Sequence, residues 1–150
     1  MADAYWRDPM IGQWEEYYSA SKDDEPIHFV VDLLNIMSIV GNFEVVAVTG
    51  RPEKWRALTM NWLIAHQVPV ERLYMRPDYD RRSSNVLKVD IVRAKLDLNE
   101  VAFALEDRER DAAAYREIGI NVLIVTKGGF RDGQGEGQGQ TGLAEGKLRR

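Results

Sequence analysis

The sequence predicts an α/β domain built on a sheet of parallel strands, and three observations carry that prediction. The chain has 150 residues, the usual size of one domain. Short apolar runs rich in valine alternate with longer segments whose apolar residues recur at helical spacing. Strands separated by helices pair in parallel through right-handed crossovers, so we expect helices on both faces of the sheet.

The first half of the chain predicts a helix, a strand, a second helix and a second strand. Acidic residues precede Pro26, and apolar residues then recur at helical spacing as far as Gly41. Residues 43–48 form a nearly continuous apolar run, which is typical of a strand buried on both faces. A helix with one apolar face is expected over 52–67, and a short strand over 72–75.

The second half repeats the alternation after a polar loop at 76–84. The predicted elements are a helix that Ser83 or Ser84 caps, a strand at 101–105, a helix at 108–118 and a strand at 121–126. Eight of the 12 glycines lie at or after Gly128, and the segment 131–150 has almost nothing to bury. We therefore expect a folded domain over 1–130 and a flexible tail over 131–150.

Composition excludes several classes of protein. The net charge of −4 argues against a strongly basic nucleic-acid coat protein. The absence of cysteine excludes disulfides, thiol catalysis and zinc–thiolate sites. No apolar run approaches the roughly 18 residues of a membrane helix, and the start of the chain lacks the apolar segment of a signal peptide. A soluble cytoplasmic protein that does not bind membranes is the expectation.

Polar residues follow the expected strands, where ligands bind in parallel α/β sheets. Thr49 supplies a hydroxyl and Gly50 allows close backbone approach, so both can donate to a phosphate oxygen. Glu106 and Asp107 are adjacent carboxylates, a suitable pair for Mg²⁺. Lys88, on the helix between them, can neutralise phosphate charge. Together these features predict a phosphoryl site.

Each feature also has a purely structural interpretation. Thr-Gly-Arg after a strand is often only a turn, Asp107 can cap the next helix, and a single lysine such as Lys88 in an amphipathic helix is usually solvated. In this order and on this architecture, the three features together are more specific than any one of them.

Four segments carry a resemblance to a known family. They read VAVTGRP at 46–52, LYMRP at 73–77 followed by DRR at 80–82 and Lys88, ALEDR at 104–108, and KGGF at 127–130. In this order they resemble the haloacid dehalogenase (HAD) superfamily, and most closely the 3′-phosphatase domain of phage-type polynucleotide kinases. The resemblance covers about residues 2–130 and implies a Rossmann-like HAD sheet. It also implies Mg²⁺-dependent hydrolysis of phosphomonoesters on nucleic-acid ends or nucleotides.

The resemblance implies a role for each site residue. The residue matching Thr49 binds the transferring phosphoryl group, and the residue matching Lys88 stabilises that group and the nucleophile. The acidic pair matching Glu106 and Asp107 holds Mg²⁺. The family more usually has two aspartates there, so we weight Asp107 above Glu106 as a metal ligand.

Arginines are expected around the entrance, or mouth, of the same phosphoryl site. Arg51 is expected to bind phosphate beside the turn, and Arg76, Arg81 and Arg82 can contact a nucleic-acid backbone. The alternative is a solvated loop whose arginines pair with nearby aspartates. The aromatic residues of 1–25, the segment that caps the mouth in the relatives, either stack on a nucleobase or pack this small cap onto the sheet.

The chain departs from the family at its start. The family begins with a strand ending in Asp-x-Asp-Gly-Thr-Leu, whose first aspartate is the nucleophile and whose second is the general acid and base. This sequence starts Met1-Ala2-Asp3, and because no apolar strand precedes Asp3 we do not expect it to replace the nucleophile. The chain as written is therefore expected to be close to inactive as a phosphatase.

The departure also has a structural consequence. In the family, the first strand lies in the middle of the sheet, between the strand ending at Thr49 and the strand ending at Asp107. Without it, those two strands either pair directly or leave open edges that invite a strand from another chain.

Two functions stay open from the sequence. The first is a HAD-type phosphatase whose start is missing from this sequence through truncation or a misassigned initiation codon. The second is a non-catalytic HAD-like protein that serves as a binding or structural subunit of an assembly.

Overall fold

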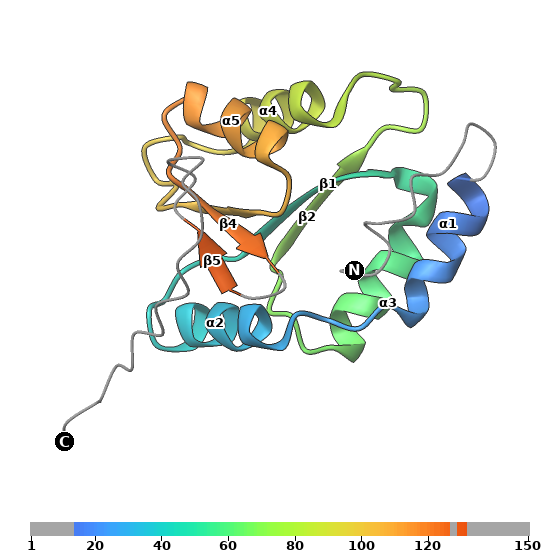
Figure 1. Ribbon diagram of the computed structural model, residues 1–150, viewed down its shortest axis with the longest axis horizontal. Helices are drawn as coiled ribbons and strands as arrows, with labels where there is room; N and C mark the ends of the chain where they lie inside the picture. Colours follow the sequence, from blue (N-terminus) through green and yellow to red (C-terminus); the bar gives the residue numbers. More distant parts are fainter. Residues whose placement is uncertain (1–13, 127–128, 132–150) are drawn as a thin grey trace, which may run out of the picture.

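The structure, a computed structural model, describes residues 14–126 and 129–131. Its helices are α1 (Trp14–Ala20), η2 (Ser21–Asp23), α2 (His28–Ile39), η3 (Glu53–Trp55), α3 (Arg56–Ala65), α4 (Ser84–Lys95) and α5 (Glu109–Glu117). Its strands are β1 (Val46–Pro52), β2 (Arg72–Arg76), β3 (Ala104–Glu106), β4 (Val122–Thr126) and β5 (Gly129–Arg131). Helices and strands alternate along most of the chain (Figure 1), so the predicted α/β class is confirmed.

The strands form two separate sheets. β1 pairs with β2 in parallel, with Val46 opposite Arg72 and Val48 opposite Tyr74. β3 pairs with β4 in parallel, and β4 pairs with β5 in antiparallel fashion. Within 14–126 and 129–131, no strand pairing joins β1 to β3. Of the two outcomes expected without a central strand, the structure therefore has the open edges.

The helices cover both sides of these strands. α4 packs on β1 and on α5, and α5 also packs on β3 and β4. In Figure 1, α4 and α5 lie on one side of the strands and α2 lies on the opposite side. The buried core gathers where α4, α5 and β4 meet, and its members are Val92, Ala112, Tyr115, Ile120, Val122 and Ile124. The C-terminal half of the described chain therefore carries the better packed core.

Among the described residues, the N-terminal half has no comparable cluster of buried apolar side chains. None of the residues of β1 from Val46 to Gly50 is fully buried, although this apolar run is predicted to be covered on both faces. α2 has no fully buried residue, and Ile36 and Ile39 are 58% and 79% exposed. β1 and α2 thus present apolar side chains that no described element covers completely.

Most element boundaries agree with the predicted ones within a few residues. The clearest shift is at β1, which starts at Val46 instead of residue 43; the N–H of Phe43 still donates to Met37 O of α2 at 3.2 Å. α5 ends before Gly119, whose φ of 87° suits glycine, as the sequence predicts. The strand β5 was not predicted. No helix in the described ranges is long and apolar enough to cross a membrane.

Two expectations fall largely outside the described residues. The tail predicted at 131–150 overlaps them only at Arg131, and the first 13 residues of the cap-like segment at 1–25 are not described. The division into domain and tail stays a prediction.

Candidate functional site

The residues that the sequence singles out line one cavity of about 1640 Å³. Its walls include residues of β1 and of β3, so it lies between the two sheets. The predicted site residues among its lining are Thr49, Gly50, Arg51, Arg76, Arg81, Arg82, Lys88, Glu106 and Asp107. Because many residues line this large cavity, shared lining does not by itself bring two of them into contact, and the polar contacts show which of them meet.

Lys88 lies at the centre of a buried ionic cluster. Its Nζ donates to Glu106 Oε2 at 2.7 Å and to Asp111 Oδ2 at 2.8 Å. Ser84 Oγ donates to the same Asp111 oxygen at 2.8 Å. The Lys88, Glu106 and Asp111 side chains are 11%, 7% and 2% exposed. This cluster joins the N-terminal part of α4 to the end of β3 and the start of α5.

Burial and charge act in opposite directions within this cluster. Burial raises the pKa of Glu106 to about 7, against the opposing effect of the Lys88 charge. Burial also acts to lower the pKa of Lys88, but the neighbouring Glu106 and Asp111 outweigh it and raise that pKa overall. Lys88 therefore stays cationic, and a phosphate that binds it has to share the ammonium group with these carboxylates.

The cluster also bears on the expected metal. Glu106 uses Oε2 for Lys88 and accepts the Asp107 N–H on Oε1 at 3.2 Å, so both of its oxygens have partners. Asp107 is exposed. The described residues contain no group of three acidic or histidine side chains that could hold a metal ion. The described residues therefore do not complete a magnesium site, and Asp107 stays a predicted ligand.

Arg51 is directed toward the N-terminal helices. The residue is only 7% exposed. Its guanidinium donates to Thr59 Oγ1 at 3.1 Å and to Ser21 Oγ, and it lies 5.5 Å from the centroid of the Tyr18 ring. Its backbone N–H donates to Thr49 Oγ1 at 3.2 Å. Arg51 thus links the end of β1 to α1, η2 and α3, and the Thr49 hydroxyl is held within the same turn.

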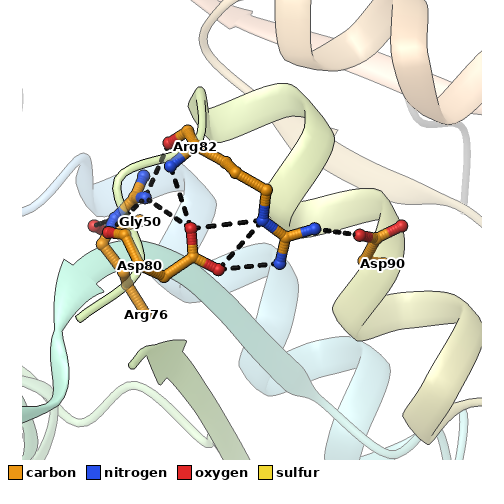
Figure 2. A network of polar contacts seen from close by, with 5 residues as sticks. All are labelled: Gly50, Arg76, Asp80, Arg82 and Asp90. Carbon is orange, nitrogen blue, oxygen red and sulfur yellow. Dashed lines mark hydrogen bonds and ion pairs between the residues drawn. The ribbon is translucent and has the colours of Figure 1, made fainter. Parts of the chain in front are cut away.

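Arg76 and Arg82 bind the loop that follows β2 (Figure 2). Arg76 Nε donates to Gly50 O at 2.7 Å, and its Nη1 donates to the carbonyl oxygens of Asp80 and Arg82 at 3.2 and 2.7 Å. Arg82 Nη2 lies 2.7 Å from Asp80 Oδ2, and its Nη1 pairs with Asp90. These two arginines have the local partners that the structural alternative describes.

Arg81 and Arg82 are both exposed and both line the cavity, but of these two only Arg82 has a hydrogen bond or ion pair among the described residues. The contact of Arg81 with a nucleic-acid backbone stays a prediction.

Two residues of the cluster were not singled out from the sequence. Asp111 lies in the first turn of α5, where an acidic residue normally only stabilises the helix dipole. Ser84 was considered only as a helix cap, but the structure has Ser83 at the N-cap and Ser84 as the first residue of α4. The sequence did contain one signal: Ser84 and Lys88 are four residues apart, and residues with that spacing lie on the same face of a helix.

The comparisons with known proteins agree with this architecture. The family model described as "Polynucleotide kinase PNKP phosphatase domain" matches residues 12–130. A search of curated proteins gives no match. A chain in the solved "Structure of Pnkp1/Rnl/Hen1 complex" is 25% identical with a TM-score of 0.66, covering 80% of this chain and 40% of that one.

A second solved chain supports the fold alone. It comes from the "Structure of the Pnkp1/Rnl/Hen1 RNA repair complex", is 23% identical with a TM-score of 0.64, and is matched over 81% of this chain and 37% of that one. This chain therefore spans about two fifths of the length of the solved chains that it resembles. Because the family model matches most of the sequence, the chain belongs to the family of polynucleotide kinase PNKP phosphatase domains.

Proposed function

We propose that this chain supplies the phosphate-binding side of a phosphatase that acts on phosphorylated nucleic-acid ends or nucleotides. The observation that carries the proposal is the buried Lys88, which two carboxylates hold at the carboxyl end of β3. A buried, permanently cationic group beside a cavity is suited to stabilise a phosphoryl group. Thr49 and Gly50 line the same cavity and can add a hydroxyl and a backbone donor.

Each residue has a defined part in this proposal. Lys88 contributes positive charge at a fixed position, because Glu106 and Asp111 keep its side chain from moving freely. Thr49 orients a phosphate oxygen, and Arg81 at the rim contacts the nucleic-acid backbone. Asp107 is the ligand that this chain contributes to Mg²⁺, and the other ligands come from outside the described residues.

We further infer that the 150-residue chain alone binds phosphate without hydrolysing it. Its sequence contains no match to the Asp-x-Asp-Gly-Thr motif that carries the attacking aspartate in the family. Without that carboxylate no covalent intermediate forms by the usual route. Attaching a strand that ends in this motif ahead of Met1 should create Mg²⁺-dependent release of phosphate from a 3′-phosphorylated oligonucleotide. Preference for 5′-nucleotides in that fusion would contradict the assigned substrate end.

Calorimetry tests the binding site itself. In Mg²⁺ buffer, the chain should bind an oligonucleotide with a 3′-phosphate more tightly than the same oligonucleotide with a 3′-hydroxyl. Lys88→Ala and Thr49→Val should each reduce that difference, and for Lys88 the loss should be roughly tenfold to a hundredfold because a hydrogen bond to a charged group is worth about 1.5–3 kcal/mol. Lys22→Ala, at an exposed lysine in η2, is the control. Equal affinity for both oligonucleotides would contradict the proposal.

A binding or structural subunit is the second candidate function. The half-buried state of β1 and its unpaired edge favour it, because such surfaces are usually covered in an assembly. The two solved chains that resemble this one also come from structures titled as complexes. If this second function is correct, the chain binds the 3′-phosphate and 3′-hydroxyl oligonucleotides with equal affinity. It also elutes with a partner from its own cells at a mass larger than 17.2 kDa.

A further inference from the structure

β1 loses its register with β2 at the segment that is expected to bind phosphate. The ladder pairs Val48 with Tyr74. The next pair is Pro52 with Arg76, so β1 advances by four residues where β2 advances by two. The extra residues of β1 fall within 49–51, the Thr-Gly-Arg turn. A bulge of this kind takes backbone groups out of the ladder, and these groups need other partners.

Arg76 supplies the partner for one of these groups. Its Nε donates to Gly50 O at 2.7 Å (Figure 2). The side chain of Arg76 is 13% exposed, and its Nη2 lies 3.4 Å from the place that a Cβ on Gly50 would occupy. Because Gly50 has no side chain, the guanidinium can lie directly against the turn.

The bond to Gly50 O fixes more than one carbonyl group. The peptide that joins Gly50 to Arg51 is planar, so holding its C=O also sets the direction of its N–H. That N–H donates to Thr49 Oγ1 at 3.2 Å. A hydroxyl has one donor and two acceptor positions, so the bond that Thr49 accepts leaves its own proton for a phosphate oxygen. The orientation of the predicted phosphate donor thus depends on Arg76 through one peptide plane.

The same guanidinium also holds the loop after β2. Its Nη1 donates to the carbonyl oxygens of Asp80 and Arg82, at 3.2 and 2.7 Å. Asp80 and Arg82 are the chain neighbours of Arg81, the residue predicted to contact a nucleic-acid backbone. One planar group with its donors in a fixed fork therefore binds backbone oxygens of two segments.

The partners of Arg76 distinguish it from an ordinary surface ion pair. Arg82, whose side chain is 49% exposed, pairs with the carboxylates of Asp80 and Asp90. Arg76 Nη1 lies 3.8 Å from Asp80 Oδ1, while its hydrogen bonds go to carbonyl oxygens. A lysine carries its donors on one nitrogen and lacks the fork, so it cannot span both segments in the same way. The geometry at Arg76 thus requires the guanidinium itself and not only a positive charge.

We propose that Arg76 is a positioning residue for phosphate binding, which joins the Thr-Gly-Arg turn and the loop after β2 into one rigid unit. It orients the Thr49 hydroxyl on one side and the backbone beside Arg81 on the other. This role differs from the contact with a nucleic-acid backbone that the sequence predicts for Arg76. The effect on binding rests on the proposed function, but the joining of the two segments can be measured without any ligand.

Hydrogen exchange followed by NMR tests the joining in the full chain. The Arg51 N–H reports on the turn, and the Arg82 N–H, which donates to Asp80 Oδ1, reports on the loop. In Arg76→Ala both amides should exchange about tenfold faster than in wild type, while the amides of β4 change less. Arg72→Ala, which removes the arginine at the other end of β2, is the control and should leave both amides unchanged. Faster exchange at only one of the two amides would overturn the proposal.

Calorimetry measures the consequence for binding. In Mg²⁺ buffer, Arg76→Ala should lose about tenfold of the preference for a 3′-phosphorylated oligonucleotide over the same oligonucleotide with a 3′-hydroxyl. Guanidinium chloride at about 50 mM, far below the concentrations that unfold proteins, should restore the preference because the free ion can donate to the same carbonyls. Ammonium chloride at the same concentration should not. Equal restoration by both salts would assign the effect to charge and overturn the proposal.

A second variant keeps the test decisive if Arg76→Ala does not fold. Arg76→Lys retains the charge and the apolar stem, yet it should show both the faster exchange and the weaker preference. Wild-type behaviour of Arg76→Lys in both measurements would overturn the proposal. A weaker preference with unchanged exchange at Arg51 would mean that Arg76 contacts the phosphate directly, and would also overturn it. If wild type itself has no preference for the 3′-phosphate, the proposed function fails, and exchange at Arg51 and Arg82 still decides whether Arg76 joins the two segments.

Discussion

Lys88 and Asp111 form a buried ion pair with Nζ and Oδ2 2.8 Å apart, and the two side chains come from neighbouring helices. α4 and α5 pack on each other, so this pair lies within the better packed half of the domain. Ser84 donates to the same oxygen of Asp111, and Glu106 holds the other side of Lys88. The position of the candidate phosphate-binding lysine therefore depends on Asp111, a residue that the sequence did not single out.

Asp111→Ala should destabilise the fold substantially. Removing one partner of a buried ion pair leaves an uncompensated charge and typically costs about 3–5 kcal/mol. Lys88 keeps Glu106, so we expect a loss in the free energy of unfolding at the lower end, about 3 kcal/mol, measured by urea denaturation. Asp90→Ala is the control, because its pair with Arg82 is half exposed and is worth at most about 1 kcal/mol. Equal losses in the free energy of unfolding for the two variants would show that the buried cluster stabilises the fold no more than the exposed pair does.

Gly50 and Ser84 should be energetically coupled. A Cβ at Gly50 would lie 3.3 Å from Ser84 Oγ and 3.4 Å from Arg76 Nη2, closer than most such contacts. Gly50→Ala therefore pushes on the hydroxyl that binds Asp111. In a double-mutant cycle, Ser84→Ala should relieve part of that cost, with a coupling energy of about 0.5 kcal/mol or more by thermal denaturation. Additive effects would place the strain at Arg76 instead.

The sequence was informative about residues whose place in the fold follows from the order of strands and helices along the chain. Because ligands bind at the carboxyl ends of parallel strands, the sequence predicted one site for Thr49, Lys88, Glu106 and Asp107. All four line the same cavity, and their role at a phosphoryl group stays a prediction. The family and the α/β class followed from the same segments and are confirmed.

The sequence was less informative about which partner each charged residue chooses. Arg51 was expected at a phosphate, yet its guanidinium contacts Thr59 and Ser21 from helices that only tertiary packing brings close. Asp111 was overlooked because an acidic residue in a first helical turn is common and needs no ion pair. No local sequence pattern shows which partners Arg51 and Asp111 contact.

The loop after β2 should depend on pH through Asp80. The hydrogen bonds from Arg82 lower the pKa of Asp80 to about 2, from an ordinary value of 3.8. Since the folded-state pKa is depressed, the stabilisation is present above about 4 and is lost as the pH falls toward 2. Wild type and Asp80→Asn should therefore differ in stability at pH 6 and converge as the pH falls below 4.

Denaturation at several pH values measures this convergence, and Asp78→Asn, at an exposed carboxylate of the same loop, is the control. A difference between wild type and Asp80→Asn that stays constant from pH 6 to pH 3 would assign the Asp80 contribution to packing and not to its charge.

Arg51→Met should separate a structural role from phosphate binding. The variant keeps most of the apolar stem but leaves the hydroxyls of Thr59 and Ser21 without their donor, which costs about 1–3 kcal/mol in the free energy of unfolding. If Arg51 acts only as a link between β1 and the N-terminal helices, the affinity of the folded variant for a 3′-phosphorylated oligonucleotide stays within about twofold of wild type. Calorimetry well below the melting temperature measures that affinity, and Thr59→Val, which removes the same bond from the other side, should match Arg51→Met in binding. A tenfold loss in Arg51→Met alone would instead return Arg51 to the phosphate site that its place in the Thr-Gly-Arg turn predicts.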